Sequence, residues 1–127
     1  YKKYQCQVVF KDGSYEAFDS PAGLLIYLLF ADKTGIIVKP LDKVFFRDFQ
    51  TGEWIDSGYS FMVVGSGEMG PMGIDFLPVL GKKNAETLKD QVKGEMIISY
   101  ARVDRKFMIK AANSNWIHFL ARKIILE

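Results

Sequence analysis

Two methionines in a loop rich in glycine and proline are the side chains of this sequence best suited to metal chemistry. The loop spans residues 65–73 and reads GSGEMGPMG, with Met69 and Met72 three positions apart. Methionine normally fills gaps in a hydrophobic core, whereas glycine with proline marks a surface turn. Thioether sulfur is a soft donor that suits Cu(I) among the biological metals. The loop therefore predicts a Cu(I) site; the alternative is that one methionine packs inward as a loop anchor.

Cys6 and His118 are two further residues of a type that binds metals. As a thiolate, Cys6 would be a strong Cu(I) ligand if its strand lay beside the methionine loop, and the alternative is a small buried hydrophobic side chain. His118 falls near the C-terminal end, where we expect it to have no ligand role. A catalytic Cys–His pair has no supporting sequence context, and the sequence contains no Walker loop. We therefore do not expect an enzyme.

The composition narrows the class of protein. The chain has 127 residues, of which 49% are hydrophobic and 25% charged, as in one compact globular domain or two small units that share a core. Its net charge of +2 arises from basic residues scattered among acidic ones, which argues against nucleic-acid binding. The longest apolar run, residues 24–31, is shorter than the about 20 residues that span a bilayer. A single cysteine excludes an intrachain disulfide.

The first half of the chain is expected to form a strand, a strand, a helix and a strand. Asp12 and Gly13 between the first two strands predict a hairpin with a type I′ turn. Asp19 or Ser20 can cap the helix, and Pro21 fits its first turn. The expected elements span residues 5–10, 15–18, 21–31 and 43–49.

The second half repeats this order with little sequence identity. Strands are expected over residues 59–64, 74–80 and 96–103, with a helix that Asn84 caps and Gly94 ends. A repeated element order predicts an α+β fold of two similar ββαβ units, residues 5–57 and 58–103. Neither unit could bury enough apolar surface alone, so the two are expected to pack together.

Residues 104–127 follow the two units as a C-terminal extension, which we expect to contain a short helix. Residues 113–115 read Asn-Ser-Asn, a plausible helix cap. The apolar face of this helix is expected to contain Ile117, Leu120, Ala121 and Ile124.

Several segments together resemble the NosL family, the accessory lipoproteins of nitrous oxide reductase. They are residues 10–13 (FKDG), 18–23 (FDSPAG), 63–66 (VVGS) and 69–73 (MGPMG), and Pro78 and the strand around residues 97–100 also fit. The similarity covers roughly residues 5–103, in matching order and spacing. The family fold is two similar ββαβ units, in agreement with the repeat inferred from the residues.

The resemblance implies a small exported protein, lipid-anchored outside the inner membrane of bacteria or archaea. It implies that the protein binds Cu(I) and delivers it to apo nitrous oxide reductase or another copper protein, with Met72 and secondarily Met69 as ligands. Contact with a membrane would be made only through a lipid anchor outside this chain, at a periplasmic location.

One departure from the family pattern bears on copper binding. Family members carry a motif ending in Cys-Gly-Met before the first strand, whereas this chain begins at Tyr1, after that position. Cys6 does not match the position of the motif. Two functions therefore stay open: a copper-delivering accessory protein, and a metal-free interaction module that kept the fold and lost the copper site.

Overall fold

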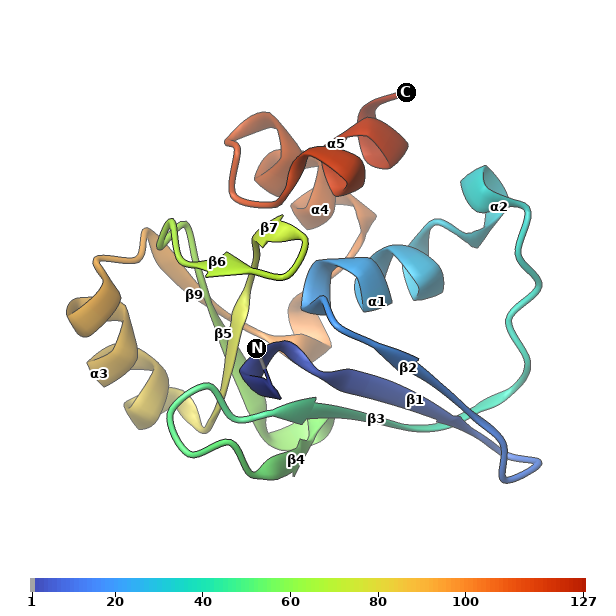
Figure 1. The fold of residues 1–127 in the computed structure, drawn as a ribbon, viewed down its shortest axis with the longest axis horizontal. Coiled ribbons are helices and arrows are strands. Elements are labelled where there is room, and N and C mark those ends of the chain that lie inside the picture. Colours follow the sequence, from blue (N-terminus) through green and yellow to red (C-terminus); the bar gives the residue numbers. More distant parts are fainter. Residues whose placement is uncertain (1) are drawn as a thin grey trace.

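The computed structural model describes residues 2–127, and its first half contains a four-stranded antiparallel sheet with the strand order β2-β1-β3-β4 (Figure 1). Helix α1 packs against β1 and β2 and, with the short α2, precedes β3. The elements are the 3-10 turn η1 (Lys2–Tyr4), β1 (Cys6–Phe10), β2 (Tyr15–Phe18), α1 (Pro21–Leu29), α2 (Ala31–Thr34), β3 (Leu41–Arg47) and β4 (Trp54–Asp56).

The second half contains a three-stranded antiparallel sheet with the order β8-β5-β9 and a separate two-stranded hairpin, β6–β7. Helix α3 packs against all three strands of the sheet. The elements are η2 (Ser57–Tyr59), β5 (Ser60–Val64), β6 (Met69–Gly70), β7 (Gly73–Ile74), β8 (Leu77–Leu80), α3 (Lys82–Val92) and β9 (Met96–Ser99).

The two sheets have the same topology. In each unit the first strand is central, the second strand lies on one side of it, and the strand after the helix lies on the other side, giving β2-β1-β3 and β8-β5-β9. The predicted α+β fold of two similar ββαβ units is thereby confirmed. The exact boundary at residues 57 and 58 stays a prediction.

Strand β5 links the two hydrophobic clusters of the protein. Met62 and Val64 belong to the main core, which also contains residues from β1, α1, β3 and the C-terminal helices. Val63 belongs to a second cluster with Leu77, Val79 and Leu88, beneath α3. Successive side chains of a strand point to opposite faces, so β5 contributes to a core on each side of its sheet. Strand β5 of the second unit therefore joins the two clusters, and through the main core it also joins the second unit to the first.

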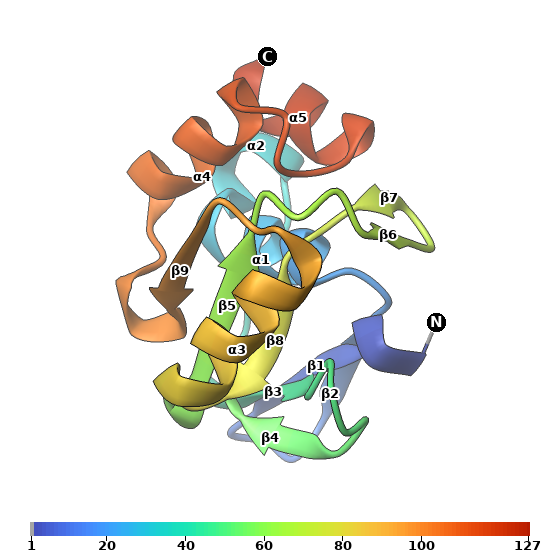
Figure 2. The same cartoon turned by 90° about the vertical axis from the view of Figure 1, so that its left-hand side faces the viewer.

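After β9 the chain forms the 3-10 turn η3 (Tyr100–Arg102), and the C-terminal extension then forms α4 (Arg105–Asn113) and α5 (Phe119–Leu126). Helices α4 and α5 pack against each other, and α5 covers α1, so the pair lies over α1 and the β6–β7 hairpin (Figure 1, Figure 2). Residues 113–115 do not cap a helix as predicted: α4 ends there, and Asn115 has the left-handed φ of 59°. The cap of α5 is His118, whose ring accepts a hydrogen bond from the Ala121 N–H.

The burial of α5 also differs from the predicted pattern. Ile117, Ala121 and Ile125 are buried, whereas Leu120 and Ile124 are 50% and 37% exposed. Ile117 precedes the helix, which begins at residue 119, and within the helix Ala121 and Ile125, four residues apart, form the buried face. None of the helices in residues 2–127 is long and apolar enough to cross a membrane.

One turn prediction and one cap prediction are wrong, and a second cap prediction is confirmed. In the β1–β2 hairpin only Gly13 has a positive φ, of 88°, while the Phe10 N–H bonds the Ser14 carbonyl, as in a three-residue loop and not a type I′ turn. Asn84 lies inside α3, which follows Gly81 directly. Ser20 caps α1, with Pro21 in the first turn as expected.

The end of α3 is also shifted from its predicted position. Lys93, and not Gly94, adopts the left-handed conformation after the helix, with φ 55°. Gly94 packs closely instead: a Cβ atom on it would lie 2.5 Å from Val63 Cγ1. The glycine is therefore required for close packing of α3 onto β5 and not for the helix cap.

Candidate metal-binding hairpin

Met69 and Met72 lie on the β6–β7 hairpin, at the surface of the protein. Met69 pairs with Ile74 and Gly70 pairs with Gly73, which leaves Pro71 and Met72 at the turn. The two methionine side chains are 60% and 41% exposed. Neither methionine is buried as a loop anchor, so both thioethers are accessible to a ligand.

The two glycines of the hairpin contact side chains from opposite ends of the chain. A Cβ atom on Gly70 would lie 2.8 Å from the Tyr4 ring, and one on Gly73 would lie 2.9 Å from His118 Cβ. Gly73 also has φ +123°, a conformation that residues with side chains rarely adopt. These contacts explain the glycines on either side of Pro71 and Met72, and they place the hairpin between η1 and the start of α5 (Figure 1, Figure 2).

Cys6 lies in the main core and not at the surface. It is 1% exposed, on β1, opposite Phe18 and Phe46 of the neighbouring strands. Burial, reinforced by the nearby Asp75 carboxyl, raises the pKa of the thiol well above its ordinary value. Because the thiolate is the form that binds metals, this position disfavours Cys6 as a ligand in the folded structure.

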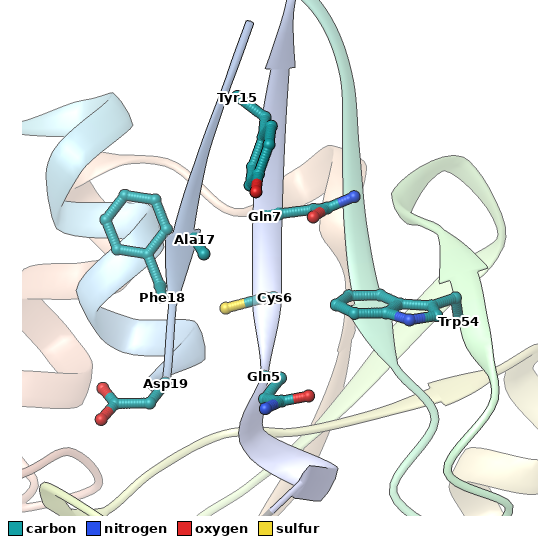
Figure 3. A pocket seen from close by; sticks show the side chains of 8 residues that line it. All are labelled: Gln5, Cys6, Gln7, Tyr15, Ala17, Phe18, Asp19 and Trp54. Carbon is teal, nitrogen blue, oxygen red and sulfur yellow. The ribbon is translucent and has the colours of Figure 1, made fainter.

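The outer face of the first sheet carries an open pocket close to Cys6 (Figure 3). Residues of β1, β2 and β4 line it, among them Cys6, Gln7, Tyr15 and Trp54, together with Asp19, which follows β2. Successive residues of β1 point to opposite faces, so Gln7 faces this pocket while Cys6 faces the core. Although Cys6 is one of the lining residues, it is only 1% exposed, so its thiol is not accessible as a ligand from this pocket.

A buried polar network lies directly behind the hairpin and joins three parts of the chain. Ser20 at the start of α1 donates a hydrogen bond to Asp75 Oδ2 (2.5 Å), and His118 Nε2 lies 3.0 Å from the same Ser20 hydroxyl oxygen. Ser20, Asp75 and His118 are 4%, 0% and 7% exposed. The network thus connects the first unit, the second unit and the C-terminal extension.

The hydrogen bonds assign the protons of this network in the state in which Asp75 is ionised. His118 Nδ1 accepts from the Ala121 N–H (3.2 Å), so the proton of the neutral imidazole is assigned to Nε2, which donates to Ser20. Burial lowers the pKa of His118, which favours this neutral form. The Asp75 carboxylate also accepts bonds from the backbone N–H groups of Ala22 and Phe76, each at 2.9 Å.

The three side chains do not form a catalytic triad. In such a triad the histidine lies between the serine and the carboxylate, whereas here Ser20 lies between Asp75 and His118. The serine hydroxyl is buried and also accepts a bond from the Gly23 N–H as the cap of α1. Its role is structural within the network.

The sequence does not predict this network: His118 is expected to have no ligand role, and Asp75 is expected to lie within the strand over residues 74–80. Two signals indicate it. Asp75 is a single carboxylate within an otherwise apolar run, and such a group requires a partner when buried. His118 directly precedes the helical residues whose apolar members, Ala121 and Ile125, recur at helical spacing. The residue directly before such a segment is the N-cap of the helix.

We predict that Asp75 makes the stability of the protein depend on pH. Burial raises the pKa of Asp75 from 3.8 to about 7. The folded state therefore keeps a proton that the unfolded chain loses near pH 4, and this contribution to stability falls as pH rises through 7. Between pH 5 and 8 the loss is on the order of 2 kcal/mol. Because the lowered pKa of His118 raises stability with pH in both proteins, the Asp75 contribution is measured as the difference between the wild type and Asp75→Asn in urea unfolding at the two pH values.

The Asp75→Asn variant cannot titrate at this position, so it should lack this fall in the free energy of unfolding between pH 5 and 8. Glu86→Gln, an exposed carboxylate on α3 that does not contact this network, serves as the control and should keep the wild-type dependence. An equal pH dependence in Asp75→Asn and in the wild type would contradict the assignment.

The fold and the hairpin together define the class of the protein: a small α+β protein of two ββαβ units that presents two thioethers on a tight turn. The chain belongs to the NosL family, whose sequence profile matches residues 1–108. This confirms the resemblance inferred from the loop and strand motifs. NosL is a copper chaperone family and not a family of enzymes.

Comparison with solved structures supports the fold. The crystal structure of the copper chaperone NosL from Shewanella denitrificans matches with a TM-score of 0.67 and 21% sequence identity, over 80% of this chain and 79% of that chain. No curated protein matches the sequence. The family match ends inside α4, so α5 and His118 lie outside it. Within residues 2–127 no group of three or more His, Cys, Asp or Glu residues could hold a metal ion.

Proposed function

We propose that this protein is a copper(I)-binding accessory protein that delivers copper to apo nitrous oxide reductase or a related periplasmic copper enzyme. The observation that carries the proposal is the β6–β7 hairpin, which presents Met69 and Met72 at the surface on a backbone fixed from both sides. Membership of the NosL family supports the link to copper.

Thioether ligands suit a protein that transfers Cu(I). Methionine sulfur does not protonate, so Met69 and Met72 can hold Cu(I) across a pH range where a thiol would compete with protons. Because the exposed turn supplies only a few ligands, a ligand of the recipient protein can bind the metal before the methionines release it. Copper is thus the cargo of this site and not a permanent cofactor.

Further ligands are proposed to come from upstream of the first strand, as in the family motif that ends in Cys-Gly-Met. The contact between Tyr4 and Gly70 supports this, because a chain extended upstream of η1 would begin beside the hairpin. Cys6 is the weakest of the three candidate ligands, since its buried thiol would have to leave the core. We also propose a periplasmic location, with a lipid anchor carried by the full-length protein.

An anaerobic Cu(I) competition titration against a chromophoric chelator tests the proposal. It compares this chain with a version extended upstream to the native start of the protein. We expect the extended version to bind more tightly. Binding by both would show that the hairpin is sufficient. Binding by neither would overturn the proposal and favour the metal-free interaction module.

A further inference from the structure

We propose that His118 is a positioning residue for the methionine hairpin, so that the C-terminal helices form part of the copper site. The inference rests on the proposed function. It goes beyond the family match, which ends at residue 108 and does not include His118. It also assigns a role to a buried polar network that copper binding by the two methionines alone does not require.

His118 is in contact with Gly73 of the hairpin. The space in which a Gly73 side chain would lie is filled by His118, with 2.9 Å between the ideal Cβ position and His118 Cβ. Gly73 follows Met72 directly and pairs with Gly70 across the hairpin. The position of residue 118 therefore limits where the turn that carries Met72 can lie.

His118 is itself held in place by hydrogen bonds to both ring nitrogens. Its ring uses both nitrogens: Nδ1 accepts from the Ala121 N–H at the start of α5, and Nε2 bonds the Ser20 hydroxyl. The side chain is 7% exposed. A buried ring with both nitrogens paired has little freedom, since movement would leave polar groups without partners. His118 is therefore a fixed surface for the hairpin to pack on.

The same network also attaches the hairpin to α1 at a second point, Asp75. Asp75 follows β7 directly, and its carboxylate bonds both the Ser20 hydroxyl and the Ala22 N–H of α1. The outgoing strand of the hairpin is thus attached at Gly73 by packing and at Asp75 by hydrogen bonds. The first attachment depends on His118 and the second on Ser20, and the bond between His118 and Ser20 links the two.

Fixing the hairpin would strengthen copper binding. When a metal binds a mobile turn, ordering of the turn lowers its conformational entropy and weakens binding. A preorganised turn avoids this loss. Residues that orient metal ligands without binding the metal typically change affinity by about 10- to 100-fold. We therefore expect loss of the His118 bond to Ser20 to lower Cu(I) affinity about tenfold.

Two substitutions at this position separate the bonds of the ring. In His118→Asn the side-chain oxygen can replace Nδ1 as the cap of α5, but the bond to Ser20 is lost. In His118→Gln the longer amide can still donate to Ser20. Asp104→Ala is the matched control, because it removes the cap bond from Asp104 to the Phe107 N–H of α4 without touching the hairpin network.

Two readouts are measured in the protein extended upstream: hydrogen exchange of the amides of residues 69–74 without metal, and Cu(I) affinity by competition titration. We expect His118→Asn to speed exchange at the hairpin and weaken Cu(I) binding, with partial rescue by His118→Gln. Asp104→Ala should leave both unchanged. If His118→Asn does not fold, Asp75→Asn replaces it, with the same expected changes.

The readouts distinguish failure of this inference from failure of the proposed function. Unchanged hairpin exchange in a folded His118→Asn variant would overturn the positioning role, whether or not the protein binds copper. Faster exchange with unchanged Cu(I) affinity would overturn the role in the copper site. Absence of Cu(I) binding by the wild type would overturn the proposed function, while the exchange measurement would still decide whether His118 holds the hairpin.

Discussion

Replacing Met72 by leucine is expected to lower the Cu(I) affinity of the upstream-extended protein by at least about tenfold. Leucine keeps the size and apolar character of the side chain, so the change removes the sulfur donor while disturbing packing little. Met72 lies at the turn of the hairpin and is 41% exposed, which leaves its sulfur free to bind a metal. Anaerobic competition titration with a chromophoric Cu(I) chelator gives the affinity.

Two further methionines provide the comparison for this experiment. Met69→Leu should weaken binding less than Met72→Leu, since Met69 is the secondary candidate. Met96→Leu is the control, because Met96 lies in β9 and is partly buried away from the turn. Equal affinities for the wild type and Met72→Leu would contradict the assignment of the hairpin as the copper site.

Replacing Phe76 by alanine is expected to lower the free energy of unfolding by about 3–5 kcal/mol. Phe76 is fully buried, directly follows Asp75, and packs against Phe107 of α4 with 5.9 Å between ring centroids. Alanine would leave a cavity where the second unit meets the C-terminal extension. Urea unfolding followed by circular dichroism measures the change.

Phe119→Ala is the matched control for Phe76→Ala. Phe119 lies at the start of α5 and is 64% exposed, so its truncation should change the free energy of unfolding by about 0.5 kcal/mol or less. A small effect of Phe76→Ala, comparable to that of Phe119→Ala, would show that the extension does not share the core of the two units.

The extension is thus part of the folded body of this NosL-family protein. Phe107, Met108, Ala111 and Ile117 belong to the same core cluster as β1, α1 and β3. Outside the core, Arg105 bonds Asp32 (2.6 Å) and the Leu29 carbonyl, which ties α4 to the end of α1. Removal of the extension would expose this core, so its contribution to copper binding is tested better by single substitutions than by truncation.

The family and the repeated ββαβ order could be predicted from the sequence because their signals are local. Alternating apolar residues identify strands such as β1 and β5, and Ser20 with Pro21 marks the start of α1. The glycine and proline residues around Met69 and Met72 likewise identify an exposed turn. Each of these features depends on neighbours within a few positions of the chain.

Local signals failed where a tertiary contact decided the backbone. The strand predicted over residues 74–80 is interrupted after Ile74, because Asp75 turns inward to bond Ser20 and the Ala22 N–H. At the end of the chain, the helix begins at residue 119, after His118, and not after residues 113–115 as predicted. In both cases a buried polar side chain required a distant partner, and a bonded partner outweighs local propensity.

The sequence by itself therefore determined the family, the two-unit fold and the thioether hairpin as the candidate copper site. Only the tertiary structure decided that Cys6 is buried and that His118 lies against Gly73. Ser20 meets Asp75 and His118 across separations of 55 and 98 residues. Such pairs leave no periodic pattern in the chain, since they form only when the packing of both units and the extension brings the side chains together.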